Sequence, residues 1–123
     1  MLISAERTRK PFDAVIADDD DVAIAAITVA ELLVGVELAT SRHRARRATF
    51  VEGVLGTLVV EDYTVDTARS HAALLSATRR EGRPRGAHDL IIAATAVSTG
   101  RILVTADDRG FEGLLRLESR VIR

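Results

Sequence analysis

Short, mostly apolar runs alternate with longer stretches of helical periodicity along the chain. Residues 22–27 read VAIAAI and residues 101–105 read RILVT, and acidic residues or a glycine bound both runs. Runs of this kind are typical of strands that are buried on both faces of a parallel sheet. Residues 57–60 form a weaker strand candidate, and residues 120–123 could add an edge strand.

Apolar residues spaced three or four apart predict the helices that separate these strands. Thr28 stands where a helix could begin, Thr64 starts a long helical pattern, and Gly82 with Pro84 ends it. Gly100 follows the most apolar of the helical stretches. The expected helices cover residues 4–17, 28–38, 44–55, 64–81, 87–98 and, as a last short piece, 110–117.

Strands that alternate with helices of about 10 to 15 residues indicate an α/β fold with a mostly parallel central sheet. The 123 residues, of which 47% are hydrophobic, fit one domain spanning residues 1–123. In such sheets ligands bind at the carboxyl ends of the strands. Residues just after a strand, or at the start of the next helix, are therefore the first candidates for a functional site.

The composition restricts the chemistry of any metal site. The chain has no cysteine, so a metal must be held by oxygen or imidazole ligands, which favours hard cations. The net charge is only −1, but the positive charge is almost entirely arginine and clusters at residues 42–47 and 79–85. Arginine suits phosphate, although solvated helix faces explain such clusters equally well. Charges within the first ten residues interrupt any signal peptide or membrane span, which favours a cytoplasmic protein.

Three carboxylates are expected just after a strand or near the start of the helix that follows it. Glu31 is expected in the first turn of the helix after the strand at 22–27, Asp89 opens the apolar helix, and Asp107, with Asp108 beside it, follows the strand at 101–105. Carboxylates that share one rim of a sheet can hold divalent metal ions, which stabilise charge on the attacking and leaving oxygens of a phosphodiester. The pattern is compatible with metal-assisted hydrolysis without a Ser, Cys or His nucleophile.

Each acid also has a structural explanation. Glu31 could be the distal member of a capping box with Thr28. Asp89 could simply favour the positive end of its helix, and Asp107 with Asp108 could form a plain turn. The acidic run at 18–21 precedes a strand, so it is expected at the opposite edge of the sheet as a solvated turn. His43, His71 and His88 lack the spacing of a metal pair and are interpreted as surface or packing residues.

Three blocks of the sequence, in order, resemble PIN-domain ribonucleases and, within them, the VapC toxins of type II toxin–antitoxin modules. The blocks are TVAELLVG at 28–35, HDLIIAATA at 88–96, and LVTAD at 103–107 followed by Phe111. The resemblance implies a PIN-like three-layer fold and an Mg²⁺- or Mn²⁺-dependent endoribonuclease. It also implies a tRNA- or rRNA-class substrate, neutralisation by a VapB-like antitoxin, and a homodimer.

The same resemblance assigns roles to particular residues. It implies that Asp89 and Asp107 are metal ligands and that Glu31 holds a metal ion or its water. Thr105 would position the loop that carries Asp107, with Asp108 in support.

One block of the family pattern has no counterpart. The family opens with a central strand that ends in an aspartate, whereas this chain opens with MLISAE, which resembles the residues after that aspartate. We therefore expect the first strand to be missing or truncated and the first metal-binding acid to be absent, Glu6 being a poor substitute. Either the true start lies upstream, or this is a truncated member with impaired catalysis.

Two rival functions follow from these observations. A phosphoacceptor receiver domain is also a small α/β fold with clustered acids, but it would need a lysine after a late strand, and Lys10 is the only lysine here. The second rival is a catalytically impaired PIN-fold protein that binds RNA or an antitoxin without cutting RNA.

Overall fold

The computed structural model describes residues 1–3, 22–105, 110–114 and 116–121. The helix expected at 4–17, the acidic run at 18–21, and Asp107 and Asp108 lie outside the described residues. The described elements are β1 (Leu2–Ile3), β2 (Ala23–Ala25), α2 (Ala26–Glu37), α3 (Ser41–Thr57), β3 (Val59–Glu61), α4 (Val65–Glu81), α5 (Ala87–Thr99), β4 (Leu103–Thr105) and β5 (Ser119–Val121).

The strands form one parallel sheet in the order β3-β2-β1-β4-β5. The two residues of β1 lie at its centre, where Leu2 aligns with Ala23 of β2 on one side and with Leu103 of β4 on the other. The first strand, expected to be missing or truncated, is present as the two residues of β1. Leu2 and Ile3 are almost fully buried, and their backbone pairs with both neighbours where β2 and β4 would otherwise expose unpaired edges.

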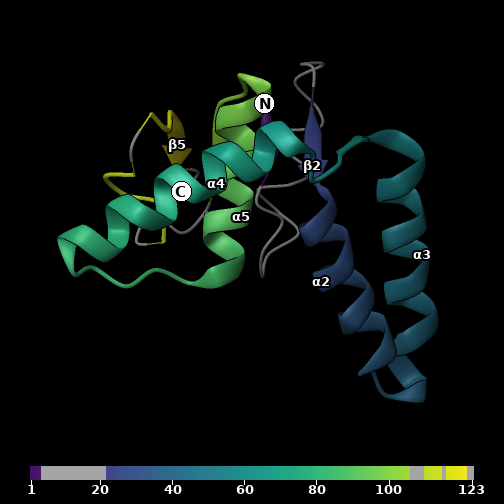
Figure 1. Cartoon of the computed structure of the whole chain (residues 1–123). Helices are drawn as coiled ribbons and strands as arrows, with labels where there is room; N and C mark the ends of the chain where they lie inside the picture. The colour runs from purple at the N-terminus through teal and green to yellow at the C-terminus, as the bar shows by residue number, and fades with distance from the viewer. Residues whose placement is uncertain (4–21, 106–109, 115, 122–123) are drawn as a thin grey trace.

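Helices cover both faces of the sheet, which gives three layers (Figure 1). Leu2 and Leu103 point to the face that packs against Leu74 of α4 and Leu90 of α5. Ile3 and its neighbours point to the other face, where Val54 of α3 is buried. Successive residues of a strand alternate between faces, so every short strand contributes to both cores. The expected α/β architecture is confirmed.

The sequence pattern located most helices correctly. Thr64 caps α4, because its Oγ1 accepts a hydrogen bond from the backbone N–H of Thr67 at 3.2 Å. Gly82 and Gly100 end α4 and α5 in the left-handed conformation, with φ of 64° and 67°. Glycine adopts this conformation without steric cost, which explains why both helices end where the breaker residues stand.

The helix expected at 110–117 is not present among the described residues of that stretch. Residues 110–113 form a turn, and Leu114 and Leu117 donate to carbonyl groups three residues earlier. Gly113 and Arg116 have φ of 73° and 63°, values that a right-handed helix cannot contain. Phe111 and Leu114 are nevertheless buried in the core beside α5. Tertiary packing therefore holds this segment as a turn.

The pair of α2 and α3 runs antiparallel and extends from the sheet at one end of the molecule (Figure 1). At the opposite side α4 crosses over α5, and the two helices pack closely. Within the part of the chain that the structure describes, no helix is both long and apolar enough to cross a membrane.

Candidate active site

Asp89 lies in the first turn of α5, and its carboxylate is held between two glycines. A Cβ atom added to Gly86 would lie 3.2 Å from Oδ2 of Asp89, and one added to Gly110 would lie only 2.6 Å from the same oxygen. The carboxylate therefore touches the backbone of the segment that follows β4. Both glycines provide space that any other residue would fill, and Asp89 remains only partly buried.

Glu31 approaches the same end of α5 from the neighbouring helix α2. Its Oε2 lies 3.7 Å from Nδ1 of His88, the residue that precedes Asp89. The side chains of Glu31 and His88 are 46% and 57% exposed, so both reach solvent at this rim. The structure thus brings Glu31 and the His88–Asp89 pair together from positions more than fifty residues apart in the sequence.

The position of Glu31 within α2 differs from the expectation. Helix α2 begins at Ala26, directly after β2, so Glu31 lies in its second turn and not in its first. The N-cap is Ala25, whereas Thr28 is 2% exposed inside the helix, which rules out the Thr28–Glu31 capping box. In the described part of the structure Oγ1 of Thr28 has no hydrogen-bond partner. The side chain of Glu31 is consequently not engaged in capping the start of α2.

Thr105 and Gly110 are the described residues on either side of the Asp107 segment. Thr105 ends β4 and is 1% exposed, and Gly110 touches Asp89. Asp107 and Asp108 themselves lie outside the described residues. Of the three acids expected at one rim, the structure places Glu31 and Asp89 at the amino-terminal half of α2 and α5.

The donor set of this rim fits a hard divalent cation. Asp89 and Glu31 supply carboxylate oxygens, which Mg²⁺ and Mn²⁺ prefer, and neither is deeply buried. No group of three or more possible ligands occurs among the described residues. Mg²⁺ needs only one or two protein carboxylates because it keeps several waters, so the two described acids are compatible with such an ion.

The other two histidines fit the interpretation as surface or packing residues. Nδ1 of His71 is 2.8 Å from the hydroxyl of Tyr63, and the two rings meet edge to face, while His43 is exposed on α3. The contribution of Gly86 and Gly110 was not foreseen. Gly86 and Gly110 belong to different segments of the chain. A single sequence does not show which segments contact each other in the fold, so it could not identify this pair of glycines.

Comparison with known proteins identifies the family. The PIN domain family matches residues 1–114. The chain belongs to the PIN-domain family. It is 36% identical over 97 residues to the tRNA(fMet)-specific endonuclease VapC of Shigella flexneri, which covers 77% of this chain and 72% of that protein. It is 39% identical over 111 residues to the ribonuclease VapC5 of Mycobacterium tuberculosis, which covers 88% and 78% respectively.

Solved structures agree with this PIN-domain assignment. The VapBC-5 structure from Mycobacterium tuberculosis has a TM-score of 0.74 and 33% identity, with 82% of each chain covered. The DNA-bound VapBC structure from Salmonella typhimurium has a TM-score of 0.84 at 24% identity, covering 98% of this chain and 96% of that one. The latter likeness concerns the fold alone. Together they confirm the expected PIN-like fold and its resemblance to VapC proteins.

Proposed function

We propose that this PIN domain is a metal-dependent endoribonuclease of the VapC kind, which hydrolyses RNA phosphodiester bonds. The observation that supports it best is the meeting of Asp89 with Gly110 and of Glu31 with His88 at one end of α5. Relatives that are 33% to 39% identical carry the names ribonuclease or tRNA-specific endonuclease. A receiver-type phosphoacceptor is not favoured, because neither the family nor the lysine content fits it.

In this proposal Asp89 and Asp107 bind the metal ion, and Glu31 holds the metal ion or its water. A bound Mg²⁺ or Mn²⁺ supplies the positive charge that stabilises phosphate oxygens during hydrolysis. Asp89 provides a fixed carboxylate, because Gly86 and Gly110 confine it on two sides. Glu31 is the more mobile acid, since its side chain is about half exposed. Thr105, at the end of β4, is the positioning residue for Asp107, and Asp108 supports Asp107 in the same role.

Binding of Mn²⁺ or Mg²⁺ is expected to raise the melting temperature of the protein. A ligand that binds only the native state at about 100 times its Kd stabilises it by about 2.7 kcal/mol. Thermal melting with and without the metal chloride measures the effect, and sodium chloride at equal ionic strength is the control. RNA cleavage should depend on the same ions. A melting temperature that is insensitive to both metals would contradict a metal site at this rim.

Glu31→Gln is expected to lower RNA cleavage by on the order of 10-fold to 100-fold with little change in stability. The Glu31–His88 contact is exposed, and exposed ion pairs contribute little to folding. His88→Gln removes the same contact and leaves Glu31 in place, so it is the matched control. If both variants lost equal activity, the contact itself would matter and Glu31 would have no direct role toward the metal.

A second candidate is a PIN-domain protein that binds RNA or an antitoxin without cutting RNA. The opening residues MLISAE resemble those that follow the first aspartate of the family pattern, so this acid has no counterpart among residues 1–123. A metal-dependent rise in melting temperature without RNA cleavage would favour this candidate. Cleavage that requires Asp89 would exclude it.

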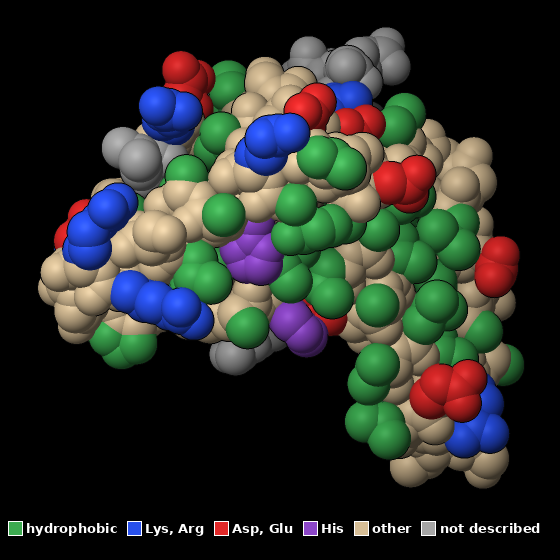
Figure 2. Space-filling model, viewed as in Figure 1, with side chains coloured by type: hydrophobic (Ala, Val, Ile, Leu, Met, Phe, Trp, Pro, Cys, Tyr) green, Lys and Arg blue, Asp and Glu red, His purple; other side chains and the backbone are tan. Residues whose placement is uncertain are grey.

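A VapB-like antitoxin is the proposed protein partner. Two of the solved structures that this chain resembles are of VapBC proteins, and one of these is described as a member of the VapBC family of toxin–antitoxin systems. In this chain, α2 and the residue that follows it expose three large apolar side chains: Leu33 is 42% exposed, Val34 52% and Leu38 81%. Figure 2 shows hydrophobic side chains over the projecting α2–α3 pair. Such an apolar stripe is suited to a partner helix, and a homodimer is part of the same proposal.

A further inference from the structure

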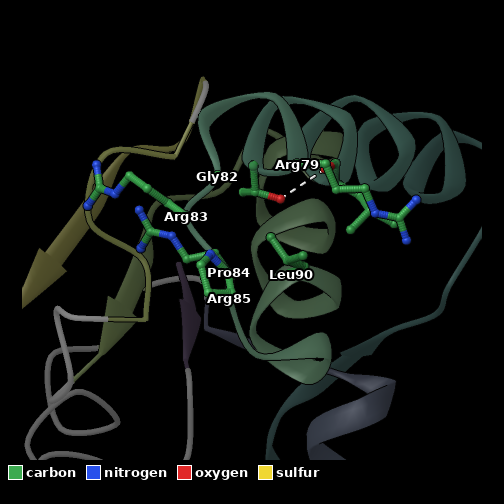
Figure 3. Close-up of a pocket in the computed structure, with 8 residues that line it drawn as sticks. Arg79, Gly82, Arg83, Pro84, Arg85 and Leu90 are labelled. Carbon is green, nitrogen blue, oxygen red and sulfur yellow. Dashed lines mark hydrogen bonds between the residues drawn. The ribbon is translucent and has the colours of Figure 1, made fainter.

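A cavity of about 370 Å³ opens where α4 ends and α5 begins. Its apolar walls come from buried Leu90 and from Leu75 and Pro84. Three arginines also line the cavity: Arg79, Arg83 and Arg85. In Figure 3 the side chains of Arg83 and Arg85 extend to the same side of the cavity, whereas Arg79 extends to the other. Arg83 and Arg85 therefore form the pair of cations that can act on one ligand.

The two guanidinium groups approach the turn at residues 110–113, in which Gly110 contacts the carboxylate of Asp89. A Cβ atom added to Gly113 would lie 3.9 Å from Nη1 of Arg83 and 3.9 Å from Nη2 of Arg85. Nη2 of Arg85 also donates a hydrogen bond to the carbonyl oxygen of Glu112, which orients its guanidinium group. No carboxylate forms an ion pair with Arg83 within the described residues, so its charge is available to an anion.

The same two backbone segments carry both the arginines and the acid. Gly86 immediately follows Arg85 and touches the carboxylate of Asp89, and Gly110 touches that carboxylate three residues before Gly113. An anionic chain that reaches Asp89 can thus continue along these segments to Arg83 and Arg85. Planar guanidinium groups bind phosphate through paired hydrogen bonds, and apolar walls accept an unstacked base.

We propose that Arg83 and Arg85 bind a backbone phosphate of RNA that flanks the cleaved bond, with the cavity receiving the adjoining base. This inference rests on the proposed nuclease function and names a subsite for the substrate. The pair positions the strand, while Asp89 and Glu31 act at the cleaved phosphate. Because the contact is to the sugar–phosphate backbone, it should strengthen binding without selecting a base sequence by itself.

Arg83→Ala is expected to weaken binding of single-stranded RNA by on the order of 10-fold and to reduce the salt dependence of log Kd by about 0.7. The binding assay uses Asp89→Asn protein without divalent metal, so that RNA remains intact. Arg83→Lys should recover only part of the affinity, because lysine keeps the charge but loses the paired hydrogen bonds. Arg46→Ala, on exposed α3, removes the same charge away from the cavity and is the matched control.

Equal RNA affinity of the Arg83→Ala and Arg46→Ala proteins would overturn the subsite. If Arg83→Ala in an otherwise unaltered chain still cut RNA normally at low RNA concentration, only the subsite would fail and the nuclease function would stand. If the protein neither bound nor cut RNA, both proposals would fail together.

Discussion

Asp89→Asn is expected to lower metal-dependent RNA cleavage by on the order of 10³-fold, the effect of removing a principal electrostatic group from an active site. Asparagine has the shape of aspartate and fits the narrow space between Gly86 and Gly110, where a Cβ atom on either glycine would lie 3.2 Å or 2.6 Å from Oδ2. The fold should therefore persist while the negative charge that attracts the metal is lost. Rates of RNA cleavage with Mn²⁺ or Mg²⁺ measure the effect.

The chain offers a matched control for this substitution. Asp66 lies in the first turn of α4 as Asp89 lies in the first turn of α5, so both carboxylates interact with the positive end of a helix. Losing that interaction costs each helix about 0.3–1 kcal/mol. Asp66→Asn should show this loss of stability with full cleavage. Equal cleavage by the Asp89→Asn and Asp66→Asn proteins would mean that Asp89 has only a role at its helix end.

Gly110→Ala is expected to lower cleavage by about 100-fold, the size of effect that follows when a reacting group is misplaced by about 1 Å. The new methyl group would lie 2.6 Å from Oδ2 and 3.2 Å from Cγ of Asp89, which is closer than these atoms tolerate. The Asp89 side chain can rotate away at small cost in stability, because only its carboxylate is in the way. Rotation removes the carboxylate from the position that the metal requires.

Gly53→Ala is the control for the glycine substitution, because a Cβ atom at Gly53 of α3 meets nothing within 4 Å. Alanine there should raise the unfolding free energy by about 0.5–1 kcal/mol and leave cleavage unchanged. Gly110 does not have a positive φ, unlike Gly113, so its backbone also accepts alanine. Full activity of the Gly110→Ala protein together with unchanged metal binding would show that the position of Asp89 is not critical.

The sequence alone determined the four helices from α2 to α5 and most of the described strands. Thr64 and Gly82 bound α4, and Gly100 ends α5, because capping and left-handed conformations act within a few residues. The alternation of apolar runs with helical stretches likewise predicted the parallel α/β sheet. The ordered blocks around Glu31 and Asp89 were sufficient for the family. These features depend on neighbours along the chain, which a single sequence contains.

Tertiary structure alone decided how the site is assembled. Residues 1–3 complete the centre of the sheet, and residues 110–113 form a turn against α5, because burial and strand pairing overrode the local patterns. The contacts of Gly110 with Asp89, of Arg85 with Glu112, and of Glu31 with His88 join segments that are distant in sequence. The order of the strands brings these segments together, and no local periodicity specifies which backbones will then touch.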